Sequence, residues 1–155
     1  MKRRSAAALL TALTLAGCGG SPADSVAPTA ETIAFLRVDP SALRGCVDVE
    51  QIVIDGAAAM IAGSEDAAVG SAAQSGLRRC GEVTALIDVA GRPPEQRARA
   101  DVCRRAFAAK VEAYTALNRA LASDGDFMAA QQGLRAFLSG MRTSTPLMRD
   151  CNTPR

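Results

Sequence analysis

The chain of 155 residues has no histidine and no tryptophan, and it has only one tyrosine and four phenylalanines. Without histidine it can form no Ser-His-Asp triad, no Cys-His nucleophile pair, no histidine metal site and no axial histidine ligand for haem. Few aromatic side chains are available for burial, and alanine and glycine, which are abundant, each contribute little apolar area. We therefore expect a small non-enzymatic fold that needs covalent cross-links and takes no cofactor.

The N-terminus carries the most specific motif. The charged residues 2–4 precede an apolar run over residues 6–16, which is the layout of a secretory signal peptide. The run is too short to span a bilayer, which needs roughly 20 apolar residues. It ends in Leu15, Ala16, Gly17 and Cys18, and this ending resembles the lipobox of bacterial lipoproteins.

The resemblance covers residues 1–18 and implies that Cys18 receives a diacylglycerol thioether, that residues 1–17 are removed, and that the new amino group is acylated. A thiolate is a suitable nucleophile for this alkylation, and each buried CH₂ of an acyl chain adds about 0.8 kcal/mol to anchoring. Because Gly19 and not aspartate follows Cys18, the resemblance implies an outer-membrane lipoprotein that faces the periplasm. The inner membrane and an ordinary cleaved signal followed by a free cysteine are the alternatives.

Removal of the signal would leave 138 residues with 15 basic and 16 acidic side chains, a net charge of −1. This length suits one domain. A nearly neutral envelope protein gives no electrostatic reason to expect a nucleic-acid partner.

Four further cysteines remain, an even number in an exported chain, and this predicts two disulfides. A zinc site would need close pairs of the Cys-x-x-Cys type, and no such pair is present, so we expect no metal site. The cysteines are Cys46, Cys80, Cys103 and Cys151.

The organisation expected after Cys18 is a flexible tether and then one helical domain over residues 39–155. The tether, residues 18–38, is rich in small and polar residues with prolines at its start. Residues 31–38 are apolar enough to pack on the domain, either as a short helix or as an extended segment.

Apolar residues at spacings of three and four predict four helices in the domain. Asp39 and Pro40 begin the first helix, and Gly91 ends the second. Pro94 and Glu95 begin the third, and Asp124 or Asp126 caps the fourth, which is followed by a polar tail from Thr143. The expected buried faces are Cys46, Val49, Val53, Ala57 and Met60; Val69, Ala73, Leu77, Cys80, Val83, Ile87 and Ala90; Cys103, Phe107, Val111, Tyr114, Leu117 and Leu121; and Phe127, Leu134, Leu138 and Met141. Four helices joined by short turns predict an all-α fold, a small antiparallel bundle stapled by two disulfides.

The cysteines also support this arrangement. Cys46 and Cys80 are equally distant from the first turn, and Cys80 and Cys103 are equally distant from the second. In an antiparallel bundle these three cysteines are therefore expected at one height along the helices. The C-terminal tail can bring Cys151 back to the same height. This agreement does not choose the pairing. Flanking charges favour Cys46–Cys80 with Cys103–Cys151, because a Cys80–Cys103 bridge would place the arginines beside Cys80 level with those beside Cys103.

Two acidic pairs could carry chemistry, but both have a simpler explanation. Glu65 and Asp66 could act in acid–base catalysis, although adjacent acids at a helix start usually interact with the helix dipole. Asp124 and Asp126 resemble the start of a calcium loop, but the later ligands are missing, so capping is the better interpretation.

The third helix is basic. Its basic residues are Arg97, Arg99, Arg104, Arg105, Lys110 and Arg119, with acids interspersed. A solvated face is the simpler interpretation, and a docking face for an acidic partner or anionic head groups, with Arg97, Arg104 and Arg105 as contacts, is the functional one.

These observations predict a non-enzymatic envelope lipoprotein whose bundle binds another protein, as an immunity protein or inhibitor or as an accessory subunit of an envelope assembly. It would contact the membrane through its lipid anchor. The alternative is a periplasmic carrier or sensor of a small apolar ligand held between the helices.

Overall fold

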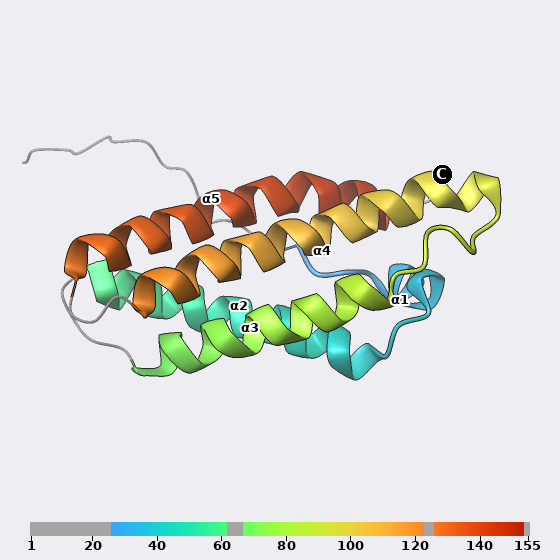
Figure 1. Ribbon diagram of the computed structural model, residues 1–155. Coiled ribbons are helices and arrows are strands. Elements are labelled where there is room, and N and C mark those ends of the chain that lie inside the picture. Colours follow the sequence, from blue (N-terminus) through green and yellow to red (C-terminus); the bar gives the residue numbers. More distant parts are fainter. Residues whose placement is uncertain (1–25, 62–66, 123–125, 154–155) are drawn as a thin grey trace, which may run out of the picture.

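The computed structural model describes residues 26–61, 67–122 and 126–153, and within them it is all-α. A short helix, α1 (Ala30–Leu36), precedes four long ones: α2 (Pro40–Ile61), α3 (Ala67–Leu86), α4 (Pro94–Leu121) and α5 (Phe127–Asn152). The long helices run antiparallel in chain order, and α1 lies at the end of the bundle where α3 ends and α4 begins (Figure 1). The predicted antiparallel helical bundle is confirmed, with α1 as an additional helix.

The predicted helix starts are confirmed where the structure describes them. The Asp39 carboxylate accepts hydrogen bonds from the Ser41 backbone N–H (3.0 Å) and the Ser41 hydroxyl at the start of α2. Pro94 is the first residue of α4. The Oδ1 atom of Asp126 accepts from the N–H groups of Met128 (2.9 Å) and Ala129 (3.1 Å) and so caps α5. Asp124, Glu65 and Asp66 lie outside the described residues.

Helix α3 ends at Leu86, five residues before the predicted end at Gly91. The reason is a local turn. Asp88 Oδ1 accepts a hydrogen bond from the Gly91 N–H (2.8 Å), and the Arg92 N–H bonds to the Val89 carbonyl (3.3 Å). Aspartate favours such turns over a continuing helix. Ile87 remains buried from the loop, whereas Ala90 is exposed, contrary to the prediction.

Helix α5 continues through the segment predicted to be a polar tail and contains Pro146 in its interior. Pro146 cannot donate to the carbonyl four residues earlier. The continuing helix is favoured because its buried face repeats every three or four residues beyond the proline. That face comprises Leu134, Phe137, Met141, Ser144, Met148 and Cys151.

The segment left open by the sequence, residues 31–38, contains helix α1. Thr29 caps it by accepting from the Thr32 N–H (3.2 Å), and Arg37 ends it in the left-handed conformation at φ 57°. Leu36 and Val38 are buried in the core. Structured packing on the bundle therefore begins before residue 39.

Small residues set the close approach of α4 and α5. A Cβ atom on Gly140 would lie 2.6 Å from the Ala113 Cβ, and one on Gly133 would collide with the Ala120 Cβ. The two contacts lie seven residues apart on each helix, so α4 and α5 stay close over about two turns. The abundant glycine and alanine thus serve helix packing here.

Candidate functional site

The four cysteines form the two predicted disulfides, Cys46–Cys80 between α2 and α3 and Cys103–Cys151 between α4 and α5. All four side chains are buried. Each bridge joins neighbouring antiparallel helices, so the favoured pairing is confirmed. Disulfides of this kind form in an oxidising compartment outside the cytoplasm. None of the described helices is both long enough and apolar enough to cross a bilayer.

The expected single layer of three cysteines is wrong. A Cβ on Gly76 of α3 would collide with the Tyr114 ring of α4, and Asn118 Nδ2 donates to the Ala73 carbonyl (3.0 Å). This register places Cys80 level with Lys110, seven residues or roughly 10 Å along α4 from Cys103. The early end of α3 and the longer connection to α4 explain the shift.

A charged pair lies inside the bundle. The Lys110 ammonium of α4 donates to Glu50 Oε1 of α2, and both side chains are buried. Lys110 was predicted to lie on a solvated face, and this is wrong, because its side chain points between the helices. The hydroxyl of Tyr114, one turn further along α4, is buried without a hydrogen-bond partner among the described residues. Burial, and then the charge of Glu50, raises the pKa of Tyr114.

The predicted partner-binding arginines lie near the start of α4. Arg104 and Arg105 are exposed and pair with Asp101 at 2.9 Å and 3.1 Å. Arg97 donates from Nε to the Arg92 carbonyl (2.8 Å). The structure therefore brings Arg104 and Arg105 together around one carboxylate, whereas Arg97 interacts with the loop before the helix.

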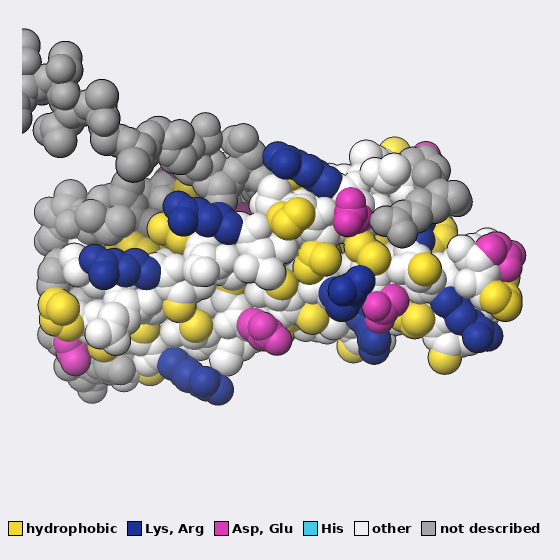
Figure 2. Space-filling model, turned by 90° about the horizontal axis from the view of Figure 1, so that it is seen from above, with side chains coloured by type: hydrophobic (Ala, Val, Ile, Leu, Met, Phe, Trp, Pro, Cys, Tyr) yellow, Lys and Arg dark blue, Asp and Glu magenta, His cyan; other side chains and the backbone are white. Residues whose placement is uncertain are grey.

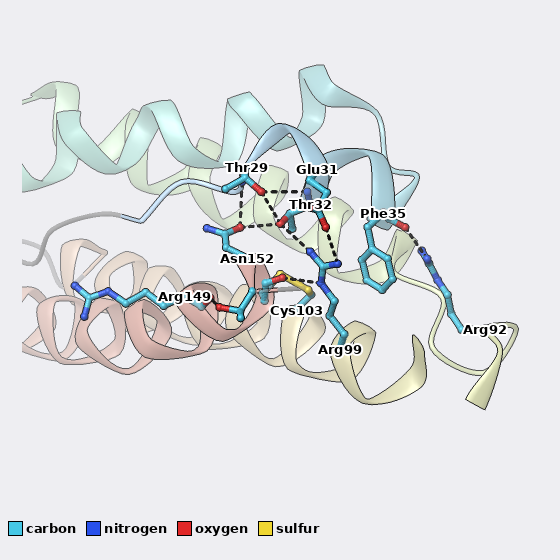
Figure 3. Close-up of polar contacts among 11 residues, drawn as sticks. Thr29, Glu31, Thr32, Phe35, Arg92, Arg99, Cys103, Arg149 and Asn152 are labelled. Carbon is cyan, nitrogen blue, oxygen red and sulfur yellow. Dashed lines mark hydrogen bonds and ion pairs between the residues drawn. A yellow bond between two sulfur atoms is a disulfide. The ribbon is translucent and has the colours of Figure 1, made fainter. Parts of the chain in front are cut away.

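Arg99 is not part of a solvated face, because it holds α1 against the bundle together with Arg92. The Phe35 ring lies between the two guanidinium groups (Figure 3). Its centroid is 4.4 Å from Arg99 Cζ and 4.5 Å from Arg92 Cζ. Arg92 also donates to the carbonyls of Phe35 (2.6 Å) and Leu36 (2.9 Å). A cation at the carbonyl end of a helix stabilises it.

Arg99 also connects α1 to the second disulfide. Its Nε donates to the Cys151 carbonyl (2.9 Å), and its Nη atoms reach Glu31 (3.2 Å) and Thr32 (3.4 Å). Only 10% of the Arg99 side chain is exposed. One arginine thus joins α1, α4 and the last turn of α5.

Asn152 completes the attachment of the N-terminal segment, which we call the clasp and define as residues 27–36 with Arg92, Arg99 and Asn152. Asn152 Oδ1 accepts from the Thr29 N–H (3.1 Å) and the Thr32 hydroxyl (2.9 Å), and its Nδ2 donates to the Ala27 carbonyl (2.9 Å) (Figure 3). These partners are more than 100 residues apart in the chain, so sequence reasoning missed the clasp. The only local signal was the capping pattern at Thr29.

Charge is divided unequally between the two halves of the bundle. Helices α4 and α5 carry nine basic and four acidic residues, a net charge of +5, whereas α2 and α3 carry three basic and four acidic residues, a net charge of −1. Seen from the α4–α5 side, basic side chains are spread along the surface with acidic ones among them (Figure 2). This half can attract anionic partners.

Cys18, the predicted lipidation site, lies outside the described residues. Among the residues that the structure describes, no three His, Cys, Asp or Glu side chains gather where they could hold a metal ion. The described buried cysteines and the buried Glu50 are engaged in cross-links and an ion pair.

Comparison of the chain with protein-family models, with curated proteins and with solved structures found no match.

Proposed function

We propose that the chain is a lipid-anchored protein of the bacterial cell envelope, on the outer membrane and facing the periplasm, whose stapled bundle binds another protein. It would neutralise an envelope effector, as an immunity protein or inhibitor does, or serve as an accessory subunit of an envelope assembly. The lipobox-like residues 15–18 support the anchor, and the two disulfides support export.

The observation that carries the proposal is the clasp. Arg92, Arg99 and Asn152 fasten the segment that follows the anchor to the end of the bundle. The clasp therefore shortens the chain between Cys18 and the bundle, because the segment is hydrogen-bonded to the bundle from Ala27 onward. A short attachment suits a module that presents one surface to a partner near the membrane.

The buried reactive groups support binding over catalysis. Glu50 and Lys110 neutralise each other inside the bundle, and the Tyr114 hydroxyl is closed to solvent. These side chains contribute to the fold and present no nucleophile or acid–base group at the described surface. We propose Arg97, Arg104 and Arg105 as contacts for an acidic partner, because Arg104 and Arg105 are exposed beside a single carboxylate.

The anchor is tested by Cys18→Ala in the native organism. This variant should lose lipid labelling and leave the membrane fraction after a high-salt wash. Unchanged salt-resistant association would contradict the lipid anchor.

Partner binding is tested by capture from detergent-solubilised envelopes with the intact lipoprotein as bait. We expect a partner near one-to-one that is lost with Arg104→Glu/Arg105→Glu and kept with Arg78→Glu, an exposed charge reversal on α3. A small molecule in native mass spectrometry, with no protein partner, would favour the carrier alternative instead.

A further inference from the structure

Three exposed arginines follow one another along α5 at intervals of seven residues: Arg135, Arg142 and Arg149. Seven residues are nearly two helical turns, so the three side chains leave α5 along one line. The buried face of α5 is turned roughly 130° around the helix from these side chains. No ion pair joins any of the three guanidinium groups to another residue that the structure describes. We call this set the arginine line.

The arginine line has an apolar end and no acid along it. Met128, seven residues before Arg135, continues it, and 61% of this residue is exposed. Asp150, the acidic residue within α5, lies about 100° around the helix from Arg149. On the adjacent helix α4, Arg104 and Arg105 share the single carboxylate of Asp101. The three arginines of α5 differ from them in having no acidic side chain along their line.

The clasp places Ala27 at the end of α5 that follows Arg149. Ala27 is bonded to Asn152, which is one helical turn from Arg149, and the Arg149 side chain points away from the clasp (Figure 3). Ala27 is nine positions after Cys18, so the two are at most roughly 30 Å apart even when the chain is fully extended. Helix α4, with 28 residues, is about 42 Å long. The end of α5 thus stays closer to the lipidated residue than the bundle is long.

We propose that the arginine line lies against anionic phospholipid head groups of the bilayer that anchors Cys18. This inference rests on the lipid anchor proposed above. Guanidinium groups bind phosphate oxygens in a bidentate manner, and each basic residue near an anionic surface adds to the attraction. Met128 would rest in the interface. Helix α3 lies across the bundle from α5, so it would face away from the membrane (Figure 1).

The absence of tryptophan from the chain allows a direct test with the intact lipoprotein in vesicles. We would introduce Met128→Trp on the arginine line and, as the matched control, Leu86→Trp on α3, where 57% of the residue is exposed. Vesicles would contain phosphatidylcholine alone or mixed with phosphatidylglycerol, with a quencher on the lipid head groups. We expect quenching for Met128→Trp in the anionic vesicles and none for Leu86→Trp. Adding Arg135→Gln, Arg142→Gln and Arg149→Gln should abolish the quenching, and raised salt should weaken it.

Co-flotation with the vesicles separates the two proposals. A protein that floats but shows equal quenching at the two positions, or quenching that does not depend on the three arginines, would overturn the membrane-facing line while leaving the anchor in place.

A protein that does not float would show that the anchor itself is absent. In that case the unanchored chain provides the test. Its partition to anionic vesicles should fall roughly fivefold per arginine removed, from the attraction expected per basic residue, and a partition independent of the arginines would overturn the inference. A last outcome is that an acidic protein binds α5 through these arginines, while vesicles without that protein give no quenching. The arginine line would then be a protein-binding site, and the inference would be wrong.

Discussion

Glu50 of α2 and Lys110 of α4 form an ion pair across the bundle in which 0% and 2% of the two side chains are exposed. Removal of either partner would leave one charge buried. Lys110→Met should therefore lower the free energy of unfolding by about 3–5 kcal/mol, measured by urea denaturation with the disulfides intact.

The double variant Glu50→Leu/Lys110→Met is the matched control, because an apolar pair of similar volume needs no partner. It should recover most of the loss, and stability can even exceed that of the original chain. If the losses of the single variants simply added in the double variant, the two charges would not depend on each other and the prediction would be wrong.

Tyr114 gives a prediction on pH. Its pKa is raised in the folded chain by burial and by Glu50, whereas the unfolded residue titrates near 10.0. Above that pH the unfolded chain releases a proton that the folded chain retains. The stability is therefore fully present below pH 10.0 and falls as the pH rises beyond it. Tyr114→Phe should abolish this fall, measured by denaturation at several alkaline pH values.

The same variant should cost little at neutral pH. The Tyr114 hydroxyl has no hydrogen-bond partner among the described residues, so its removal should leave the free energy of unfolding unchanged or raise it by up to about 1 kcal/mol. As the chain has one tyrosine, the absorbance of tyrosinate reports this residue alone. A normal titration near pH 10 in the folded protein would show that the ring is accessible.

Gly140 and Gly81 form a matched pair. A Cβ on Gly140 would lie 2.6 Å from the Ala113 Cβ and 3.2 Å from its Cα, whereas a Cβ on Gly81 would meet no atom within 4 Å. Gly140→Ala should destabilise the protein by about 1–3 kcal/mol through overpacking. Gly81→Ala should stabilise it by about 0.5–1 kcal/mol through helix propensity. Equal effects in thermal denaturation would contradict the close approach of α4 and α5.

The two disulfides should differ in their effect on the clasp. Replacing Cys103 and Cys151 by alanine should cost about 2–4 kcal/mol and should also loosen the last turn of α5, which holds Arg99 and Asn152. Hydrogen exchange in α1 should then accelerate more than global unfolding accounts for. Replacing Cys46 and Cys80 should lower stability without this selective effect on α1, and equal acceleration would contradict the link.

Local chemistry explains which features the sequence predicted. Asp39, Pro94 and Asp126 act on the first turn of their own helices, so their roles can be inferred from a few residues. The disulfide pairing was inferred from flanking charges, because a Cys80–Cys103 bridge would place arginines level with arginines, whereas the turn positions left the pairing open.

The remaining features depend on residues far apart in the chain. Pro146 is unfavourable within a helix by itself, and only the packing of Met148 and the bridge at Cys151 makes α5 continue. The arginine line emerges only once α5 is known to extend past Pro146. The position of Arg92 against Phe35 depends on the loop after α3, which the apolar pattern assigned to a helix.

Each disulfide joins cysteines that are consecutive in the chain after Cys18: Cys46 with Cys80, and Cys103 with Cys151. The two covalent loops do not overlap. A chain that is exported from its N-terminus would therefore acquire the native connectivity if each new thiol reacted with the one before it. The proposed lipidation would convert the thiol of Cys18 to a thioether, so that Cys18 could not form a disulfide and disturb this order. An oxidase would then be enough to mature the protein, and the slow reshuffling catalysed by a disulfide isomerase would not be needed.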